Sequence, residues 1–384
     1  MKKKIIRVTT VPGSLGGLLK GQLKYMSTYY EIIGVSSYGP NGLLQKLSEQ
    51  EGIKVHAVEM TRTITPFKDI KAVWKLYKVF KKEQPFIVHS HTPKAGTLSM
   101  VASWLAGVPH RLHTIAGLPL VEATGFKRFV LNTVETLTYS CATMIYPNSY
   151  GLMDIILNNK FTTKKKLKVI GNGSSNGINT NYFNPALYAD KDKVILRNKL
   201  NIQSRDFTFI FVGRLVGDKG INELISAFIK LKNHQNHIKL VLVGIFEETL
   251  DPLLPKTIHR IKSDKDIIEI GWANDVRPYL AIADALAFPS YREGFPNVVM
   301  QAGSMGLPCV VSDINGCNEI IENNHTGIII PPKNTNALYQ GMLSLLNNKV
   351  EAQNMGNRSR ERIRQRYEQS YLWKAILEEY NTLK

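Results

Sequence analysis

The chain is poor in several features that identify common classes of protein. It has only 3 cysteines among 384 residues, Cys141, Cys309 and Cys317, and no two of them form a C-x-x-C pair. Such a sparse, odd set excludes a disulfide scaffold and indicates a reducing compartment. No uninterrupted apolar run reaches the roughly 20 residues of a membrane-spanning helix. We therefore expect a chain that does not cross a membrane.

The beginning of the chain lacks the pattern of a secretion signal. Lys2, Lys3 and Lys4 are basic, but Arg7 and Thr9 interrupt the apolar residues that follow. A signal peptide needs an apolar core of about 7–15 residues. We expect a cytoplasmic protein whose first strand begins near Lys4.

Acidic residues are scarce in the first half of the chain. Residues 1–182 hold 24 lysines and arginines against 9 acids, whereas the remaining residues hold 25 against 22. This basic half predicts an anionic partner, such as anionic lipid or a phosphorylated acceptor, and a surface that only aids solubility is the alternative. We expect no nucleic acid partner, because no RNA-binding aromatic signature or zinc module accompanies the charge.

Short β-branched runs alternate with longer helical stretches, and the rhythm restarts once. Strands are expected at 5–10, 30–36, 54–58, 86–89 and 111–114, and, after a polar interval at 171–184, at 207–212, 239–243, 267–270, 285–288 and 309–311. A glycine-rich turn is expected at 13–17 and a helix at 18–30. This alternation predicts an α/β protein with two doubly wound parallel sheets.

Two Rossmann-like domains follow from this rhythm. We expect an N-terminal domain at 1–182, a C-terminal domain at 183–365, and a final helix at 366–384 that packs on the first domain. Ligands of doubly wound sheets bind beyond the carboxyl ends of the strands. The expected binding site is a cleft between the two domains.

The first chemical motif follows the first strand of the second half. Gly213 and Arg214 end this strand, and Lys219 and Gly220 precede the next helix. Glycine lets the backbone approach a ligand, a helix N-terminus attracts anions, and the two cations add fixed positive charge. The pattern is typical of a diphosphate site, and two surface cations in an ordinary loop are the alternative.

The second motif occupies residues 289–297, between an expected strand and an expected helix. Glu293 is followed by Gly294 and Phe295, and Gln301 lies about two helical turns further along. A carboxylate here can accept hydrogen bonds from sugar hydroxyls, and the backbone amides after it can bind sugar or phosphate oxygens. An acid that only stabilises the first turn of a helix is the alternative.

The two motifs, in this order and followed by Gly-Leu-Pro at 306–308, resemble the retaining GT-B glycosyltransferases of family 4 type, which include sucrose synthases and bacterial capsule enzymes. The resemblance spans nearly the whole chain. Residues 88–96 and 243–248 look like the branch that builds capsules and undecaprenyl-diphosphate-linked oligosaccharides, which includes N-acetylgalactosaminyltransferases.

This resemblance implies a two-domain GT-B fold and a retaining reaction. It implies that a sugar, with N-acetylhexosamine favoured, moves from a UDP-sugar to an undecaprenyl-diphosphate-linked saccharide during assembly of capsule, lipopolysaccharide or another surface glycan. On the interpretation that the chain has no Asp-x-Asp pair, we also expect no metal–diphosphate site of the kind found in the other major glycosyltransferase fold. We therefore expect no cofactor and no metal requirement.

The resemblance assigns roles to single residues. Arg214 and Lys219 would bind the donor diphosphate and stabilise it as it leaves, and Glu293 would hold hydroxyls of the donor sugar. The other donor-binding positions that it implies are Gly16, Gly17, Gly213, Gly244, Gly294, Phe295 and Gln301. Retaining enzymes often use a carboxylate nucleophile, but no second acid is well placed here. A front-face mechanism, in which the leaving phosphate helps to deprotonate the acceptor, fits this pattern.

Two positions depart from the family pattern. Gln301 replaces a second acid that holds the ribose, and an amide offers weaker, uncharged hydrogen bonds. Ala116 replaces a histidine that many relatives have before the glycine matching Gly117. Candidate acceptor-binding residues are His91, His113 and Glu122, and a purely structural role is the alternative for each.

Two apolar stretches favour attachment to a membrane surface. Residues 97–105 contain Trp104 and Leu105, and residues 126–139 contain Phe126 and Phe129 beside the basic pair at 127–128. Apolar surface next to Lys and Arg suits a helix at an anionic bilayer, although each stretch alone could be a core-facing helix. With the basic first half, they predict a peripheral protein on the inner face of the cytoplasmic membrane.

Other functions fit parts of the pattern. A UDP-sugar 2-epimerase of the same fold would use the nucleotide site without an acceptor, and Gln301 and Ala116 suggest a catalytically weak nucleotide-sugar-binding protein. An NAD-dependent oxidoreductase is excluded because residues 13–21 lack the G-x-G-x-x-G spacing. The sequence leaves open the sugar, the linkage, the acceptor and the oligomeric state.

Overall fold

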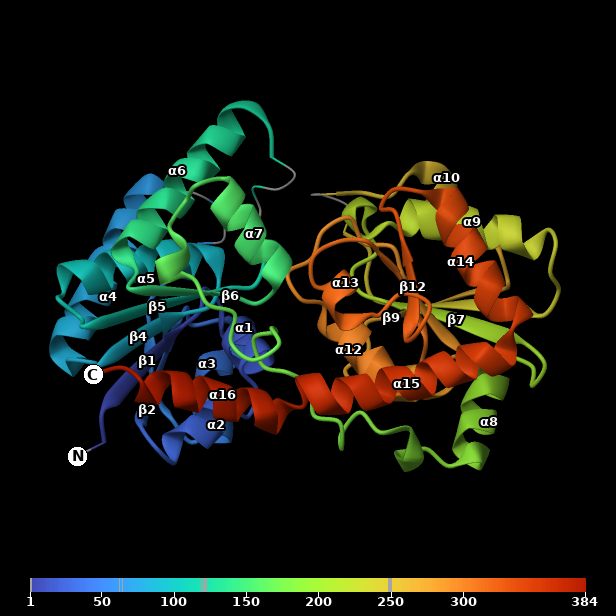
Figure 1. Cartoon of the computed structure of the whole chain (residues 1–384), viewed down its shortest axis with the longest axis horizontal. Coiled ribbons are helices and arrows are strands. Elements are labelled where there is room, and N and C mark those ends of the chain that lie inside the picture. The colour runs from blue at the N-terminus through green and yellow to red at the C-terminus, as the bar shows by residue number, and fades with distance from the viewer. Residues whose placement is uncertain (1, 62, 64, 119, 121–122, 248–250) are drawn as a thin grey trace. The chain divides into compact units, whose positions relative to one another are not determined.

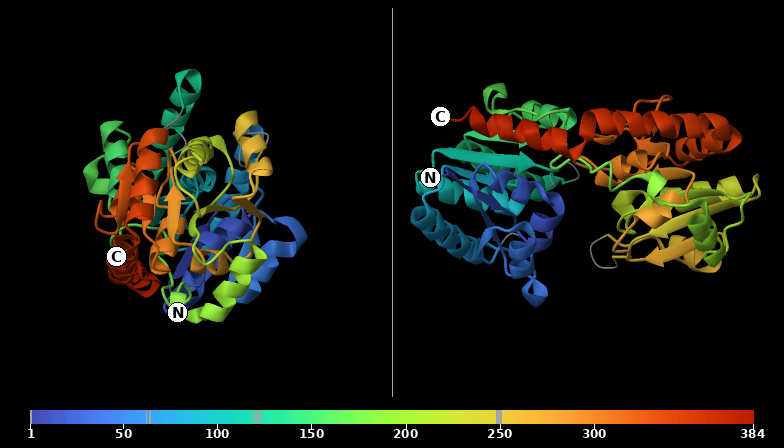
Figure 2. Two further views of the ribbon diagram at one scale, coloured as in Figure 1. Left: turned by 90° about the vertical axis from the view of Figure 1, so that its right-hand side faces the viewer. Right: turned by 90° about the horizontal axis from the view of Figure 1, so that it is seen from below.

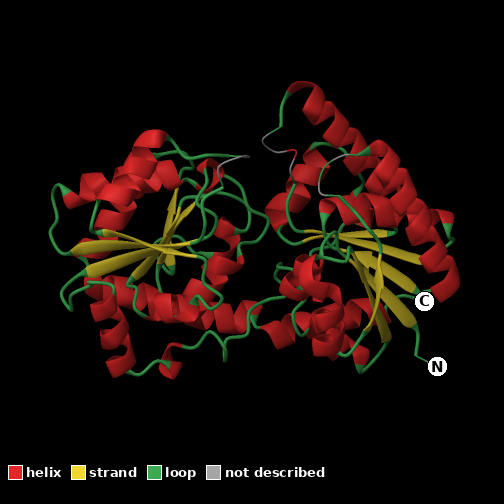
Figure 3. Cartoon of the chain, turned by 180° about the vertical axis from the view of Figure 1, so that it is seen from behind, coloured by secondary structure: helices red, strands yellow, loops and turns green. Residues whose placement is uncertain are grey.

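The computed structural model describes residues 2–61, 63, 65–118, 120, 123–247 and 251–384. The chain forms two compact units: unit 1 comprises the residues up to Gly177 together with Ser370–Lys384, and unit 2 comprises Ile178–Gln369. Each unit is a parallel sheet between two layers of helices (Figure 3). Among the described helices, none combines the length and apolar character needed to span a membrane.

Unit 1 contains a six-stranded sheet with the order β3-β2-β1-β4-β5-β6 (Figure 1). Its strands are β1 (Lys4–Val8), β2 (Glu31–Ser36), β3 (Lys54–Ala57), β4 (Ile87–Ser90), β5 (His110–Ile115) and β6 (Met144–Pro147). Its helices are α1 (Pro12–Leu18), α2 (Gln22–Ser27), α3 (Leu43–Glu51), α4 (Pro66–Glu83), α5 (Pro93–Leu105), α6 (Gly125–Cys141), α7 (Tyr150–Asn158) and α16 (Gln369–Asn381), with short 3-10 turns at Pro40–Gly42 and Lys164–Lys166.

The two faces of this sheet are covered by different helices. One face packs against α4 to α7 through residues such as Val88, Leu76 and Leu98. The other packs against α1, α2, α3 and the last helix, α16, whose Leu372 and Ile376 are buried. Figure 2 shows α16, in red, along this sheet. The end of the chain is therefore part of the core of unit 1.

Unit 2 repeats the topology, with the order β12-β11-β10-β7-β8-β9. Its strands are β7 (Phe207–Val212), β8 (Ile238–Val243), β9 (Ile267–Gly271), β10 (Ala285–Phe288), β11 (Cys309–Ser312) and β12 (Gly327–Ile330). Its helices are α8 (Asp190–Lys199), α9 (Ile221–Lys232), α10 (Pro255–Ser263), α11 (Arg277–Ala281), α12 (Asn297–Ser304), α13 (Cys317–Ile320), α14 (Thr335–Asn347) and α15 (Lys349–Tyr367), with 3-10 turns η4 (Pro185–Leu187) and η5 (Gly217–Lys219).

The prediction of two doubly wound sheets is confirmed, and the local errors have physical causes. Residues 13–17 do not form the expected turn and lie inside α1 instead. Glycine at 16 allows close packing there, since a Cβ would lie 2.5 Å from Leu47 Cδ1. The helix expected at 18–30 is interrupted at Gly21, whose φ is 75°. The sequence misses the edge strands β6 and β12, which are each only 4 residues long.

Candidate functional site

The loops after β7 and β8 come into close contact at two glycines. A Cβ on Gly244 would lie 1.8 Å from the Gly213 carbonyl oxygen, and Gly244 has φ 149°. The Leu215 amide then donates a 2.8 Å hydrogen bond to the Ile245 carbonyl. Glycine is required at 244 by the neighbouring backbone, which explains this part of the motif without reference to a ligand.

Lys219 and Glu293 form an ion pair at the carboxyl edge of the unit 2 sheet. Lys219 ends the turn η5 after β7, and Glu293 lies in the loop after β10; their side chains are 17% and 15% exposed. The Ser290 hydroxyl donates a 2.8 Å hydrogen bond to the same Oε1 oxygen that contacts Lys219. The structure thus joins the two halves of the predicted constellation into one partly exposed charged cluster.

A backbone contact holds these two loops together. A Cβ on Gly220 would lie 2.1 Å from the Pro289 carbonyl oxygen, and Gly220 has φ 69°, a left-handed conformation that favours glycine. Beside it, the Tyr291 amide donates a 2.9 Å bond to the Asp218 carbonyl, and the Arg292 guanidinium lies 2.8 Å from the Asp218 carboxylate. The position of Glu293 is therefore fixed by its loop as well as by Lys219.

The segment after Glu293 offers backbone amides rather than side chains. Among the described residues, the amides of Gly294 and Phe295 have no hydrogen-bond acceptor. The Phe295 ring is buried against Tyr367, with ring centroids 5.4 Å apart. Asn315, in the loop after β11, donates to the Glu293 and Gly294 carbonyls and fixes the peptide orientation. Two free amides near the start of α12 form a site for oxygen atoms of a ligand.

Two further predicted residues lie at this edge of unit 2 with different surroundings. Arg214 is about half exposed and is paired with Glu247, so its charge is balanced in this state. Gln301 lies in α12 and is partly exposed, and its side chain has no partner among the described residues. Gln301 therefore remains available to a ligand.

The sequence alone assigned no role to Ser290, although it lies in the motif at 289–297, and it did not point to Asn315. Both contact Glu293 directly, one through its carboxylate and one through its carbonyl oxygen. Asn315 follows a different strand and is distant in sequence from the motif. A survey of polar residues after the carboxyl end of every predicted strand would have found both, because these ends share one edge of a parallel sheet.

The predicted residues of unit 1 are mostly buried. His91 and His113 are 2% and 3% exposed, and they contact different partners, Arg7 for His91 and Ser90 for His113. Burial holds the pKa of both imidazoles below the usual range, to about 4 for His113. A Cβ added to Gly17 would meet nothing within 4 Å, and Glu122 lies outside the described residues.

The expectation of no metal site overlooked two Asp-x-Asp pairs. Asp264 and Asp266 are both ion-paired with Lys232, and Asp266 also with Lys239. Asp190 and Asp192 lie in the first turn of α8, where acids are favoured. Across the described part of the chain, no group of three His, Cys, Asp or Glu side chains is arranged as a metal site.

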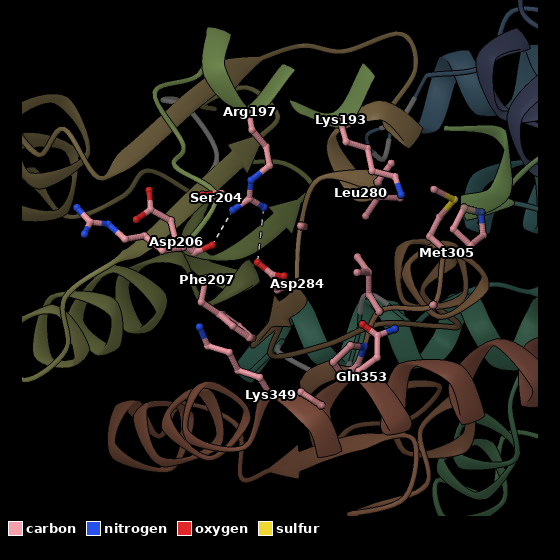
Figure 4. Close-up of a pocket in the computed structure, with 18 residues that line it drawn as sticks. Lys193, Arg197, Ser204, Asp206, Phe207, Leu280, Asp284, Met305, Lys349 and Gln353 are labelled. Carbon is pink, nitrogen blue, oxygen red and sulfur yellow. Dashed lines mark hydrogen bonds and ion pairs between the residues drawn. The ribbon is translucent and has the colours of Figure 1, made fainter. Parts of the chain in front are cut away.

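Unit 2 also has a cavity at the amino edge of its sheet, opposite the edge that carries Lys219 and Glu293 (Figure 4). Its volume is about 410 Å³, and Phe207 and Asp284, near the starts of β7 and β10, line it. Arg197 donates bonds of 2.6 and 2.7 Å to the Asp206 and Ile282 carbonyls, so it holds the cavity wall together. None of the residues of the Lys219–Glu293 cluster borders this cavity.

Comparison with known structures defines the class of fold. The chain is similar to Anabaena Alr3699/HepE, solved in complex with UDP, with a TM-score of 0.81, 18% identity and coverage of 100% of both chains. This likeness and the two Rossmann-like sheets identify a GT-B fold. Residues 33–173 match the "Glycosyl transferase 4-like domain", and residues 192–362 match "Glycosyl transferases group 1".

Comparison of sequences identifies the family. The chain is 30% identical over 382 residues to the capsular polysaccharide biosynthesis glycosyltransferase CapM of Staphylococcus aureus. The aligned region covers 99% of this chain and 97% of CapM. The chain belongs to the group 1 glycosyltransferases and is a glycosyltransferase of the GT-B fold.

Two other relatives act on lipid-linked sugars. One is the Escherichia coli UDP-Gal:alpha-D-GlcNAc-diphosphoundecaprenol alpha-1,3-galactosyltransferase, 31% identical over 76% of this chain and 74% of that protein. The other is the Campylobacter jejuni N,N'-diacetylbacillosaminyl-diphospho-undecaprenol alpha-1,3-N-acetylgalactosaminyltransferase, 30% identical over 79% and 78%. The prediction of this branch from the sequence is confirmed.

The contact at Gly220 leads to a prediction about stability. Gly220→Ala places a Cβ against the Pro289 carbonyl, whereas Gly271→Ala meets nothing within 4 Å at a similar φ of 76°. Both variants pay about 1–2 kcal/mol for the left-handed conformation. We expect urea unfolding to show that Gly220→Ala lowers the free energy of unfolding by at least about 2 kcal/mol more than Gly271→Ala does. Amide hydrogen exchange at residues 289–296 should also be faster in Gly220→Ala. Equal losses in the two variants would show that the loops are not locked at this point.

Proposed function

We propose that this protein is a retaining glycosyltransferase that moves a sugar from a UDP-sugar to an undecaprenyl-diphosphate-linked saccharide in surface glycan assembly. One observation carries the proposal: Lys219, Glu293 and the free amides of Gly294 and Phe295 lie together at the carboxyl edge of the unit 2 sheet. This is where ligands of doubly wound sheets bind. Acceptor binding is assigned to residues 1–182.

The proposed donor site combines charge with neutral hydrogen-bond donors. The diphosphate takes Lys219 and Arg214 as counter-ions, which requires each cation to loosen its present contact with Glu293 or Glu247. Glu293, released in this way, accepts bonds from sugar hydroxyls. The amides of Gly294 and Phe295 donate to oxygens of the donor, and Gln301 binds the ribose. Gly213 and Gly244 let the two loops beside this site pack closely.

The identity of the donor is supported by the relatives. The Escherichia coli relative uses UDP-Gal, the Campylobacter relative transfers N-acetylgalactosamine, and Anabaena HepE was solved with UDP. Both bacterial relatives act on undecaprenyl-diphosphate acceptors. We propose a UDP-linked N-acetylhexosamine as the donor.

The proposed reaction proceeds without a covalent intermediate. Ser290 holds the Oε1 oxygen of Glu293, which also pairs with Lys219 before the donor binds, and the released carboxylate then accepts hydrogen bonds from sugar hydroxyls. The acceptor hydroxyl attacks on the face from which UDP departs, and a leaving-phosphate oxygen takes its proton. Lys219 and Arg214 stabilise the negative charge that develops on the diphosphate. Trapping a glycosyl group on Glu293 would overturn this mechanism.

The reaction is tested by release of UDP from a panel of UDP-sugars. We expect release to depend on a lipid-diphosphate saccharide, and Lys219→Gln to lower kcat roughly 10²-fold or more because a donor to the leaving group is lost. Lys265→Gln, which removes an exposed lysine of the same unit, is the matched control and keeps full activity. Equal release without the acceptor would favour a UDP-sugar 2-epimerase or a hydrolase.

The amide at position 301 allows a test in which a substitution is expected to strengthen donor binding. Gln301→Glu restores the acid that the family uses for ribose, and charged hydrogen bonds are roughly twice as strong as neutral ones. We expect a several-fold lower KM for the UDP-sugar with kcat little changed. A higher KM, measured under the same initial-rate conditions, would remove Gln301 from the donor site.

We also propose that unit 1 attaches to the inner face of the cytoplasmic membrane. In α6, Phe126 and Phe129 are 81% and 67% exposed. The earlier candidate at 97–105 is mainly a core helix, with Leu98 and Met100 buried, and only its end at Trp104 and Leu105 is exposed. Helix α5 contacts both α4 and α6.

Helix α4 adds a basic and apolar surface that the sequence did not indicate. Phe67, Ile70 and Trp74 are 90%, 68% and 57% exposed. A hollow of about 400 Å³ beside them is lined by Lys68, Lys71 and Lys75. Exposed aromatic rings next to lysines suit the interface of an anionic bilayer.

Membrane attachment is tested by co-sedimentation with vesicles. Changing Lys68, Lys71 and Lys75 to Gln is expected to weaken binding to phosphatidylglycerol vesicles by on the order of 10²-fold, at about 1 kcal/mol for each lysine. The same change at Lys191, Lys256 and Lys265, exposed in unit 2, is the matched control. Binding that does not depend on anionic lipid, or equal loss in both variants, would count against the proposed surface.

A further inference from the structure

The turn that carries Lys219 is held by an acid from a different loop. This acid is Asp251, which lies in the loop after β8, whereas the turn η5 follows β7. The Asp251 carboxylate accepts a 2.6 Å hydrogen bond from the Asp218 backbone amide through Oδ2. The Asp251 carbonyl accepts a second bond, of 3.3 Å, from the Gly217 amide. One residue thus satisfies the first two amides of the turn, which a helical turn leaves without acceptors of its own.

The contact between Asp251 and the turn is close enough to restrict the residue at position 217. A Cβ added to Gly217 would lie 2.7 Å from Asp251 Oδ1 and 3.4 Å from Oδ2. The carboxylate therefore lies directly against the backbone of the turn. A hydrogen bond to a charged acceptor is roughly twice as strong as a neutral one. This contact fixes the backbone from which the Lys219 side chain extends.

Asp251 lies in a segment that is itself held in place. Two residues further along, Leu253 is buried in the hydrophobic core of unit 2. The Leu254 amide donates a 3.2 Å hydrogen bond to the Asn222 side chain in α9. The Asp251 carboxylate is therefore presented to the turn from a packed support.

The loop after β10 holds the other side of the turn. Gly220 packs against that loop, and the Asp218 carbonyl accepts a 2.9 Å hydrogen bond from the Tyr291 amide. Lys219 lies between these contacts and those of Asp251. Its ammonium group is carried on a flexible four-carbon stem, so its place depends on where the backbone holds the Cα. Stabilisation of developing charge requires donors that are placed in advance.

We propose that Asp251 is a positioning residue of the donor site, which acts through the backbone of residues 217–219 to place Lys219 against the donor diphosphate. This role rests on the proposed function, in which Lys219 is a counter-ion of the diphosphate. Asp251 is not placed in contact with the donor, since like charges repel. Its role differs from that of Glu247 in the same loop, whose contact with Arg214 is given up when the donor binds.

Binding of UDP to the full-length protein, measured by calorimetry, tests this role without turnover. Lys219→Gln is expected to weaken binding roughly tenfold or more because a counter-ion is lost. Asp251→Ala is expected to weaken binding roughly three- to tenfold, because a misplaced cation loses part of its interaction with the diphosphate.

A conservative variant separates the hydrogen bond from the charge. Asp251→Asn removes the charge, as alanine does, but it keeps an oxygen acceptor on a side chain of the same length. We expect Asp251→Asn to retain most of the affinity for UDP. Asp206→Ala is the matched control, because it removes an acid of unit 2 that accepts the Gln203 amide at 2.7 Å at the start of β7, on the amino edge of the sheet. This control should keep full affinity.

A double-variant cycle distinguishes positioning from a general structural effect. If Asp251 acts through Lys219, adding Asp251→Ala to Lys219→Gln should weaken UDP binding by less than about twofold further. Gly217→Ala displaces the same carboxylate without removing it, and it should also weaken UDP binding. It provides the same test if Asp251→Ala does not fold, which circular dichroism checks.

The outcomes separate this inference from the proposed function. Unchanged affinity in Lys219→Gln would overturn the proposed donor site and this inference with it. A loss in Lys219→Gln together with full affinity in Asp251→Ala would overturn only the positioning role. That role would also be overturned by equal losses from Asp251→Ala in both backgrounds, or by an Asp251→Asn variant that binds as weakly as Asp251→Ala.

Discussion

The close approach of Gly220 to the Pro289 carbonyl is the constraint on which the candidate site depends. It brings the end of the loop after β7 so close to the loop after β10 that any residue with a Cβ would collide there. Lys219 and Glu293 lie on either side of this contact, so their pairing follows from backbone packing. Two oppositely charged side chains from distant parts of the sequence thereby meet at one edge of a parallel sheet, where strand ends converge.

The ion pair has two consequences for the donor site. It keeps the charged groups compensated in the absence of ligand, which limits the cost of placing them where they are only about one-sixth exposed. It also means that an incoming diphosphate competes with Glu293 for Lys219. Binding of the phosphate and release of the carboxylate toward the sugar are therefore the same event, and the two parts of a nucleotide-sugar are recognised together.

The sequence predicted the sheets, and it suggested most residues of the candidate site, because both leave local patterns. Runs such as 207–212 are apolar and β-branched or aromatic, and strand ends carry the glycines and charged residues that the family resemblance uses. Contacts that depend on tertiary packing left no such pattern, so Asn315 was missed and Ser290, inside the motif at 289–297, was given no role. The pair Asp264 and Asp266 was overlooked although its Asp-x-Asp spacing is visible in the sequence. The helix at 97–105 has apolar residues on most sides, so its exposed end could not be told from its buried face.

Unit 1 shows where sequence reasoning is weakest. His91 was a candidate because it alternates with His89 at a strand end, and His113 because it lies near Ala116, with a structural role as the alternative for each. The structure buries both, and Arg7 and Ser90 provide their hydrogen bonds. A polar residue in a strand can thus satisfy its hydrogen bonds inside the protein, and only the three-dimensional arrangement distinguishes this from exposure to a substrate.

The contact between Gly244 and the Gly213 carbonyl affects how this protein could evolve. At 1.8 Å, any Cβ at position 244 collides with backbone, whichever sugar or nucleotide the enzyme uses. Position 244 is therefore closed to adaptation, and a change in donor preference has to arise at its neighbours. A glycine shared between this chain and a relative at that position reports common architecture and carries no information about common substrate.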